Sequence, residues 1–129
     1  MCKSLFDDQY EFLQAGDVEV GSRAAEELAS DLIYEEFHEF GAEAHCYNTN
    51  VSPQLNVVKE ALDLMYVTAQ YLNVTIGPDK ALEAWNALHA NNMSKCIDGK
   101  LVKREDGKVL KPEGYKKLDL SKVLCDTDS

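Results

Sequence analysis

Four acidic side chains stand in two pairs with the same spacing in the first half of the chain. Glu36 and Glu39 are three residues apart, and so are Glu60 and Asp63. On a helix, residues three apart lie on neighbouring turns of one face, so each pair presents two carboxylates in the same direction. Mg²⁺ is typically held by a few carboxylates, while water and phosphate oxygens fill its other positions. The spacing therefore indicates a Mg²⁺ site, with Mn²⁺ as the substitute cation.

These acids fall on apolar faces. Three glutamates share the apolar face of the helix expected over residues 23–47, namely Glu36, Glu39 and Glu43. Glu60 lies between apolar positions of the helix expected over residues 53–74, with Asp63 displaced to one side. A buried carboxylate must be protonated, paired with a base or bound to a cation, because leaving it unpaired costs several kcal/mol. Since these two segments contain one arginine and one lysine, we expect a bound cation.

Helix caps and breaks indicate the elements that position the acids. The expected helices cover about 5–14, 23–47, 53–74 and 80–93, the last of them capped by Asp79. We expect an all-α fold in which residues 1–94 form an antiparallel, four-helix-bundle-like domain. The third helix should be central and mostly buried, because its apolar residues spread almost all the way round.

The two acidic pairs stand at matching heights on the two central helices. Glu39 lies nine residues before the turn at 48–52, and Glu60 lies eight residues after it. Glu36 lies twelve residues before the same turn, and Asp63 lies eleven after it. With a rise of about 1.5 Å per residue, each acid is level with a partner on the other helix. A di-iron site is the alternative for four carboxylates in a bundle, but it needs a Glu-x-x-His motif on each of two helices, and His38, His45 and His89 do not provide this pair of motifs.

The charge is divided between an acidic body and a basic tail. Residues 1–94 carry 16 acidic and four basic side chains, whereas residues 95–117 carry eight basic and four acidic ones. Two Asp-Gly pairs punctuate the tail, and the second, Asp106-Gly107, predicts a two-residue hairpin. We therefore expect residues 95–129 to form a short extended or hairpin arm of the same domain. An acidic body with a basic tail suits a polyanionic ligand that is bound through divalent cations on one side and through lysines on the other.

Composition narrows the class of protein. A chain of 129 residues with 45% hydrophobic content is expected to form one domain with a real core. The net charge of −10 argues against a nucleic-acid partner, because nucleic-acid binding requires a basic surface. No apolar stretch approaches the roughly 18 residues of a membrane span, and the N-terminus turns acidic before a signal-peptide core forms. We therefore expect a cytoplasmic protein without a membrane partner.

Residues 24–120 resemble a known enzyme superfamily. Glu36-Phe37-His38-Glu39, followed after twenty residues by Glu60-Ala61-Leu62-Asp63, is similar to the E-x-x-E…E-x-x-D signature of the all-α NTP pyrophosphohydrolases. The flanking helices and the segment 92–112 resemble the small, free-standing bacterial or phage-type members of its MazG-like group. One departure is Ala29, which stands where many members have an arginine.

The resemblance implies a MazG fold and hydrolysis of a nucleoside triphosphate to the monophosphate and pyrophosphate, in control of the nucleotide pool. Glu36, Glu39, Glu60 and Asp63 would hold Mg²⁺, and Glu36 or Glu39 would orient the attacking water. It also implies a homodimer or homotetramer, in which a basic arm reaches the neighbouring subunit's site. Two alternatives remain open. One is a related phosphoanhydride substrate, such as an alarmone or phosphoribosyl-ATP, and the other is a regulatory oligomer that binds a metal-nucleotide without turnover.

Six further residues are candidates for binding the nucleotide, and they are Lys59, Trp85, Asn92, Lys95, Lys108 and Lys111. The lysines are candidates for the phosphates, the asparagine for the base or ribose, and the tryptophan for stacking on the base. Each has a structural alternative: Lys59 can pair with an acid, the tail lysines can be solvated, and Asn92 and Trp85 can belong to the core.

Overall fold

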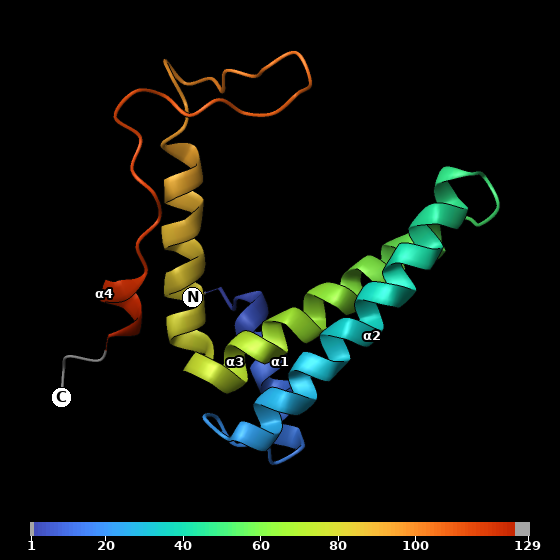
Figure 1. Ribbon diagram of the computed structural model, residues 1–129. Helices are drawn as coiled ribbons and strands as arrows, with labels where there is room; N and C mark the ends of the chain where they lie inside the picture. The colour runs from blue at the N-terminus through green and yellow to red at the C-terminus, as the bar shows by residue number, and fades with distance from the viewer. Residues whose placement is uncertain (1, 126–129) are drawn as a thin grey trace. The chain divides into compact units, whose positions relative to one another are not determined.

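The computed structural model describes residues 2–125, which are mostly helical. Its helices are α1 (Leu5–Ala15), α2 (Arg23–Asn48), α3 (Gln54–Met93) and the short α4 (Ser121–Leu124) (Figure 1). Within the described residues, β pairing is limited to two isolated antiparallel bridges. The all-α class expected from the sequence is confirmed. No helix between residues 2 and 125 is long and apolar enough to cross a bilayer.

The chain divides into two compact units, Met1–Ala81 and Leu82–Ser129. This division falls inside α3, whereas the sequence changes character after residue 94. Of the arm expected over residues 95–129, residues 126–129 lie outside the described part of the chain.

Serine caps begin α1 and α2. The Ser4 hydroxyl accepts a hydrogen bond from the Asp7 N–H (3.2 Å), and the Asp7 carboxylate accepts one from the Ser4 N–H (3.0 Å). At the start of α2, the Ser22 hydroxyl accepts from the Ala25 N–H (3.3 Å). These bonds satisfy N–H groups that have no partner inside the helix, which is why both helices begin where the sequence predicts.

α3 consists of two helical segments joined at Gly77. This glycine has φ 84° and ψ 161°, a conformation essentially restricted to glycine. Pro78 follows, and its fixed φ suits the first position of the second segment. The break therefore lies where the sequence indicates. The expected cap at Asp79 is wrong, because the helix has already resumed at Pro78.

The first unit has a small core to which three helices contribute. Its buried apolar cluster contains Leu13, Ala29 and Val74. A buried polar cluster joins α1 to α3, in which the Asn73 amide donates to the Phe6 carbonyl (3.0 Å) and to Gln9 Oε1 (2.9 Å). The Gln9 amide in turn donates to Gln70 Oε1 (3.4 Å). These polar contacts fix the register of α1 on α3.

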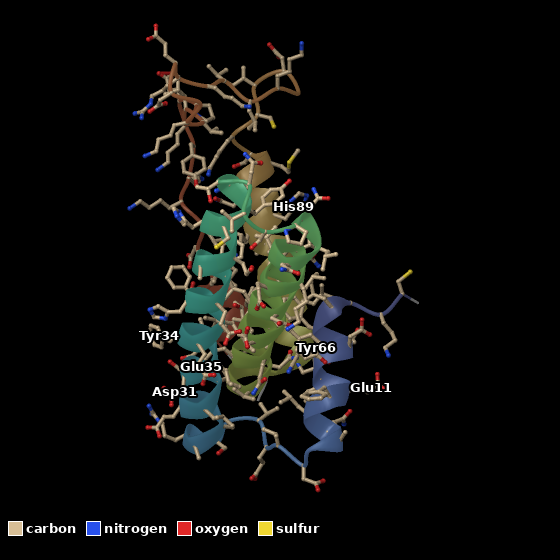
Figure 2. All side chains as sticks on the ribbon, turned by 90° about the vertical axis from the view of Figure 1, so that its right-hand side faces the viewer. Glu11, Asp31, Tyr34, Glu35, Tyr66 and His89 are labelled. Carbon is tan, nitrogen blue, oxygen red and sulfur yellow. The ribbon has the colours of Figure 1, made fainter. Side chains whose placement is uncertain are left out.

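The first half of α3 is not buried, contrary to the expectation of a central helix. Leu55 is 70% exposed and Leu62 is 59% exposed. α1 lies beside only the later part of this segment (Figure 2). The 11 residues of α1 span only about 16 Å at 1.5 Å per residue, so α1 cannot cover the whole length of this segment of α3.

The second unit contains both Asp-Gly turns. Asp98 (φ 52°) and Gly99 (φ 78°) form a two-residue turn. In the second turn, Gly107 has a positive φ (89°) and its N–H donates to the Arg104 carbonyl (2.9 Å), while the Arg104 N–H donates to the Lys108 carbonyl (2.8 Å). The two-residue hairpin predicted there is wrong. The two-residue type I′ turn needs positive φ at both central residues, and this loop instead has three residues and a glycine bulge.

Candidate metal centre

Three carboxylates from two helices meet in the first unit. Glu36 belongs to α2, while Glu60 and Asp63 belong to α3, and one oxygen from each lies within 4.8 Å of the others. The tight connection between Asn48 and Gln54 makes α2 and α3 antiparallel neighbours (Figure 1). The matching heights expected from the sequence thus bring these three acids together.

Two oxygens of this cluster are buried and have no hydrogen-bond partner, namely Glu36 Oε1 and Glu60 Oε1. All three side chains are half-buried, so water does not fully solvate the charge. A buried acceptor without a partner costs about 1–3 kcal/mol, and more when it is charged. A bound cation or added protons would therefore stabilise the cluster. In this respect the cluster differs from acidic side chains on a helix surface, whose charge is fully solvated.

The pKa of Glu36 is raised above its ordinary value. Burial of the carboxylate is the largest cause, followed by repulsion from Glu39, Asp63 and Glu60, while Lys59 acts in the opposite direction. Burial and neighbouring negative charges both disfavour the charged form of this carboxyl, and a bound cation would offset both effects. Hard oxygen donors in this number suit Mg²⁺ or Mn²⁺, so the residues fit the expected ion.

Lys59 pairs with the cluster from its rim. Its ammonium contacts Asp63 Oδ2 in an i, i+4 ion pair, and the lysine side chain remains 67% exposed. The hydrogen bond with Asp63 and the negative charges of Asp63, Glu60 and Glu36 raise the pKa of Lys59. Lys59 was considered either as a phosphate contact or as the partner of an acid, and in the structure it pairs with an acid.

Glu39 and Glu43 flank the three-acid cluster along α2. Glu39 is exposed and is not one of the three acids whose oxygens lie together, although its charge contributes to the raised pKa of Glu36. Glu43 is half-buried, accepts a hydrogen bond from the Ser52 hydroxyl (3.4 Å) through Oε1, and leaves its buried Oε2 without a partner. The structure therefore brings together three of the four predicted ligands, with the fourth at the rim.

The other predicted substrate contacts belong to the second unit. Lys95 and Lys111 both place their ammonium groups near the ring of Tyr115, at 5.8 and 5.6 Å from its centroid. Asn92 is exposed and accepts a hydrogen bond from Lys95 (3.2 Å), so it does not belong to a core. Two further candidates, Trp85 and Lys108, are also exposed.

Asn91 is the asparagine that organises this unit, and the sequence did not single it out. Its side chain donates to the Lys116 carbonyl (2.8 Å) and accepts from the Tyr115 hydroxyl (2.7 Å). These bonds hold the segment around Pro112–Asp119 against the helix, beside a cavity of about 540 Å³. The sequence does contain an indication of this packing face, because three small or polar residues recur there at helical spacing, namely Ala87, Asn91 and Ser94.

A scan against protein-family models finds no match to this chain, and a search of curated proteins finds none either. The assignment of the site therefore depends on its own geometry and on the resemblance of its two acidic motifs.

Proposed function

We propose that the protein is a Mg²⁺-dependent nucleoside triphosphate pyrophosphohydrolase. In the proposed reaction water attacks the α-phosphorus of a (d)NTP, the bond from that phosphorus to the bridging oxygen breaks, and (d)NMP and pyrophosphate leave. The cellular role would be control of the nucleotide pool.

One observation carries the proposal. Glu36, Glu60 and Asp63 place carboxylate oxygens within 4.8 Å of one another, and two of these acids have a buried oxygen with no partner. A site that gathers negative charge and leaves it unsatisfied favours a ligand that arrives with divalent cations. Nucleoside triphosphates are carried as Mg²⁺ complexes and therefore suit such a site, and the resemblance of the two acidic motifs is what points to this substrate class.

Three acids are assigned to the cation and a fourth, Glu39, to the attacking water. Glu36, Glu60 and Asp63 would hold the cation, and the backbone of α2 and α3 fixes the separation of these three acids. When bound, Mg²⁺ polarises phosphate oxygens and lowers the pKa of a coordinated water. Glu39 faces solvent one turn from Glu36, where its carboxylate can orient the attacking water and accept its proton.

Lys59 is placed to exchange partners when the substrate binds. Its ammonium pairs with Asp63 but its side chain is 67% exposed, so it can turn outward from this exposed ion pair at little cost. An ammonium at the rim then neutralises a phosphate oxygen. In the second unit, Lys95 and Lys111 form a further concentration of positive charge around Tyr115 that suits phosphate.

The test is the identity of the first product. The full chain is incubated with a panel of NTPs and dNTPs plus Mg²⁺, and pyrophosphate and orthophosphate are followed separately. We expect pyrophosphate first, loss of turnover in Glu60→Gln, and retention in Glu35→Gln, an exposed glutamate on α2 outside the cluster (Figure 2). Orthophosphate as first product refutes the proposal. Mg²⁺-dependent nucleotide binding without turnover supports a regulatory oligomer instead.

A further inference from the structure

A groove of about 330 Å³ lies between α1 and the first half of α3. Most of the side chains that line it are apolar or aromatic, namely Leu5, Leu62, Met65, Tyr66 and Ala69. Pockets for small molecules are mostly apolar and range from about 300 to 1,000 Å³. The volume of this groove is at the lower end of that range, so the groove suits one ring system rather than a whole nucleotide.

Tyr66 forms the aromatic wall of the groove and is 41% exposed. Phe12 of α1 lies edge-on to its ring, with the ring centroids 5.7 Å apart and the ring planes at 79°. Tyr66 accordingly lies between α3 and α1 in Figure 2. This edge-to-face contact stabilises one orientation of the tyrosine ring. An exposed aromatic ring that is held in place is a surface on which a nucleobase can stack.

The groove follows the candidate metal centre round the circumference of α3. At 100° per residue, Lys59 lies about 40° from Asp63, and Tyr66 lies about 20° further in the same direction. Leu62, on the wall of the groove, lies about 40° beyond Tyr66. Along the helix axis, Tyr66 is only about 4.5 Å from Asp63. Lys59, which pairs with Asp63, therefore stands between the acidic cluster and the groove.

We propose that this groove binds the nucleobase of the substrate and that Tyr66 is the residue on which the base stacks. The inference rests on the proposed function, because phosphates at the cluster and at Lys59 leave the base on the adjacent side of α3. A nucleobase is a flat, uncharged ring and matches the apolar walls and the tyrosine. Base stacking is thereby assigned to Tyr66 in the first unit rather than to Trp85 in the second.

The test compares two probes by calorimetric titration of the full chain in Mg²⁺. One probe is α,β-methylene-dATP, which cannot be cleaved between the α- and β-phosphorus atoms, and the other is inorganic tripolyphosphate, which has no base. Tyr66→Ala should weaken binding of the nucleotide about 5- to 150-fold, the range found when one stacking contact is lost. It should change binding of tripolyphosphate by less than about twofold. Tyr66→Phe keeps the ring and should bind both probes within about twofold of the wild type.

Tyr34→Ala is the matched control, because Tyr34 is a 65% exposed tyrosine on α2 outside the groove (Figure 2). It should leave both affinities within about twofold of the wild type. Equal nucleotide affinities of Tyr66→Ala and Tyr34→Ala overturn the proposal, and so does a loss in Tyr66→Ala that is as large for tripolyphosphate. A change in the mass of Tyr66→Ala by analytical ultracentrifugation, with its nucleotide affinity unchanged, assigns the groove to a protein contact and also overturns it.

Photocrosslinking tests the same site in the unmodified chain. With 8-azido-dATP, Mg²⁺ and ultraviolet light, we expect mass spectrometry to find the label within residues 5–9 or 62–69, which contain the groove-lining residues. Label found only elsewhere overturns the proposal, even if Tyr66→Ala fails to fold. A wild type that binds tripolyphosphate as tightly as the nucleotide refutes the base site alone. A wild type that binds neither probe refutes the proposed function, and the base site with it.

Discussion

Neutralising Glu36 is expected to stabilise the metal-free protein while abolishing the proposed Mg²⁺ binding and turnover. Glu36→Gln keeps the size of the side chain and removes its charge. Because burial and three neighbouring carboxylates raise the pKa of Glu36, the charged form is the one that destabilises the fold at pH 7. The variant should therefore unfold at a higher temperature than the wild type in EDTA, yet lose Mg²⁺ binding and turnover.

The size of the gain follows from the separation of the acids. Two unit charges within 4.8 Å repel by about 1 kcal/mol in water and by about 3.5 kcal/mol at an effective dielectric constant of 20. The lower value applies because the cluster is only half-buried and Lys59 offsets part of the charge. A gain of about 1 kcal/mol corresponds to a Tm increase of about 4 °C for a chain of this length.

The assay is thermal unfolding followed by circular dichroism at pH 7, in EDTA and in Mg²⁺. Glu35→Gln is the matched control, because it removes the same charge from an exposed position on the same helix. Mg²⁺ at ten times its Kd should stabilise the wild type and the control by about 1.4 kcal/mol and leave Glu36→Gln unchanged. Turnover of the variant should fall by about 100-fold or more, because loss of even an outer-shell partner of a metal ligand typically costs about 10–100-fold and Glu36 is proposed as a ligand itself. If Glu36→Gln is destabilised in EDTA, or gains as much from Mg²⁺ as the control, the reasoning is refuted.

Four further outcomes are expected. The difference in Tm between wild type and Glu36→Gln in EDTA should shrink as the pH falls from 7 to 4. The raised pKa of Glu36 means that the folded state takes up the proton at a higher pH than the unfolded state does. A difference in Tm that stays constant over this pH range contradicts the prediction. Lys59→Gln should tighten Mg²⁺ binding a few-fold in calorimetric titrations, since the ion no longer displaces an exposed ion pair, and weaker binding would oppose that role. Asn73→Ala should cost about 3 kcal/mol in urea unfolding, because it removes two buried hydrogen bonds and leaves a cavity, and a loss below about 1 kcal/mol contradicts the importance of the polar cluster. Gly77→Ala should lower the free energy of unfolding by about 1–3 kcal/mol because residue 77 has a positive φ. Helical Gly41→Ala, whose Cβ meets no atom within 4 Å, should raise the free energy of unfolding by about 0.5–1 kcal/mol. Equal urea midpoints for the two variants would contradict this.

Helix ends and the meeting of the acids were predictable because they depend on local rules. Ser4 and Ser22 cap helices through short-range hydrogen bonds, and Gly77 breaks α3 because its conformation suits glycine alone. Spacing along the helices and the short connection after α2 were enough to bring Glu36 and Asp63 together.

The remaining features depend on tertiary contacts that local spacing does not contain. Helical projection put Glu39 on the same face as Glu36, but it cannot say how far across that face the neighbouring helix reaches, and Glu39 falls at the exposed rim. The exposure of Leu55 and Leu62 in the first half of α3 depends on the length of α1 rather than on the residues of α3 itself. Asn91 was overlooked because its partners lie 24 and 25 residues further along the chain.

The proposed function requires that Glu36, Glu60 and Asp63 together hold a divalent cation. Its most direct test is anomalous X-ray diffraction from crystals of the full chain grown with Mn²⁺, collected above and below the manganese absorption edge. We expect an anomalous peak bonded to oxygens of all three carboxylates, at about 2.2 Å from each. A peak elsewhere, or none with the three side chains turned into solvent, would contradict it.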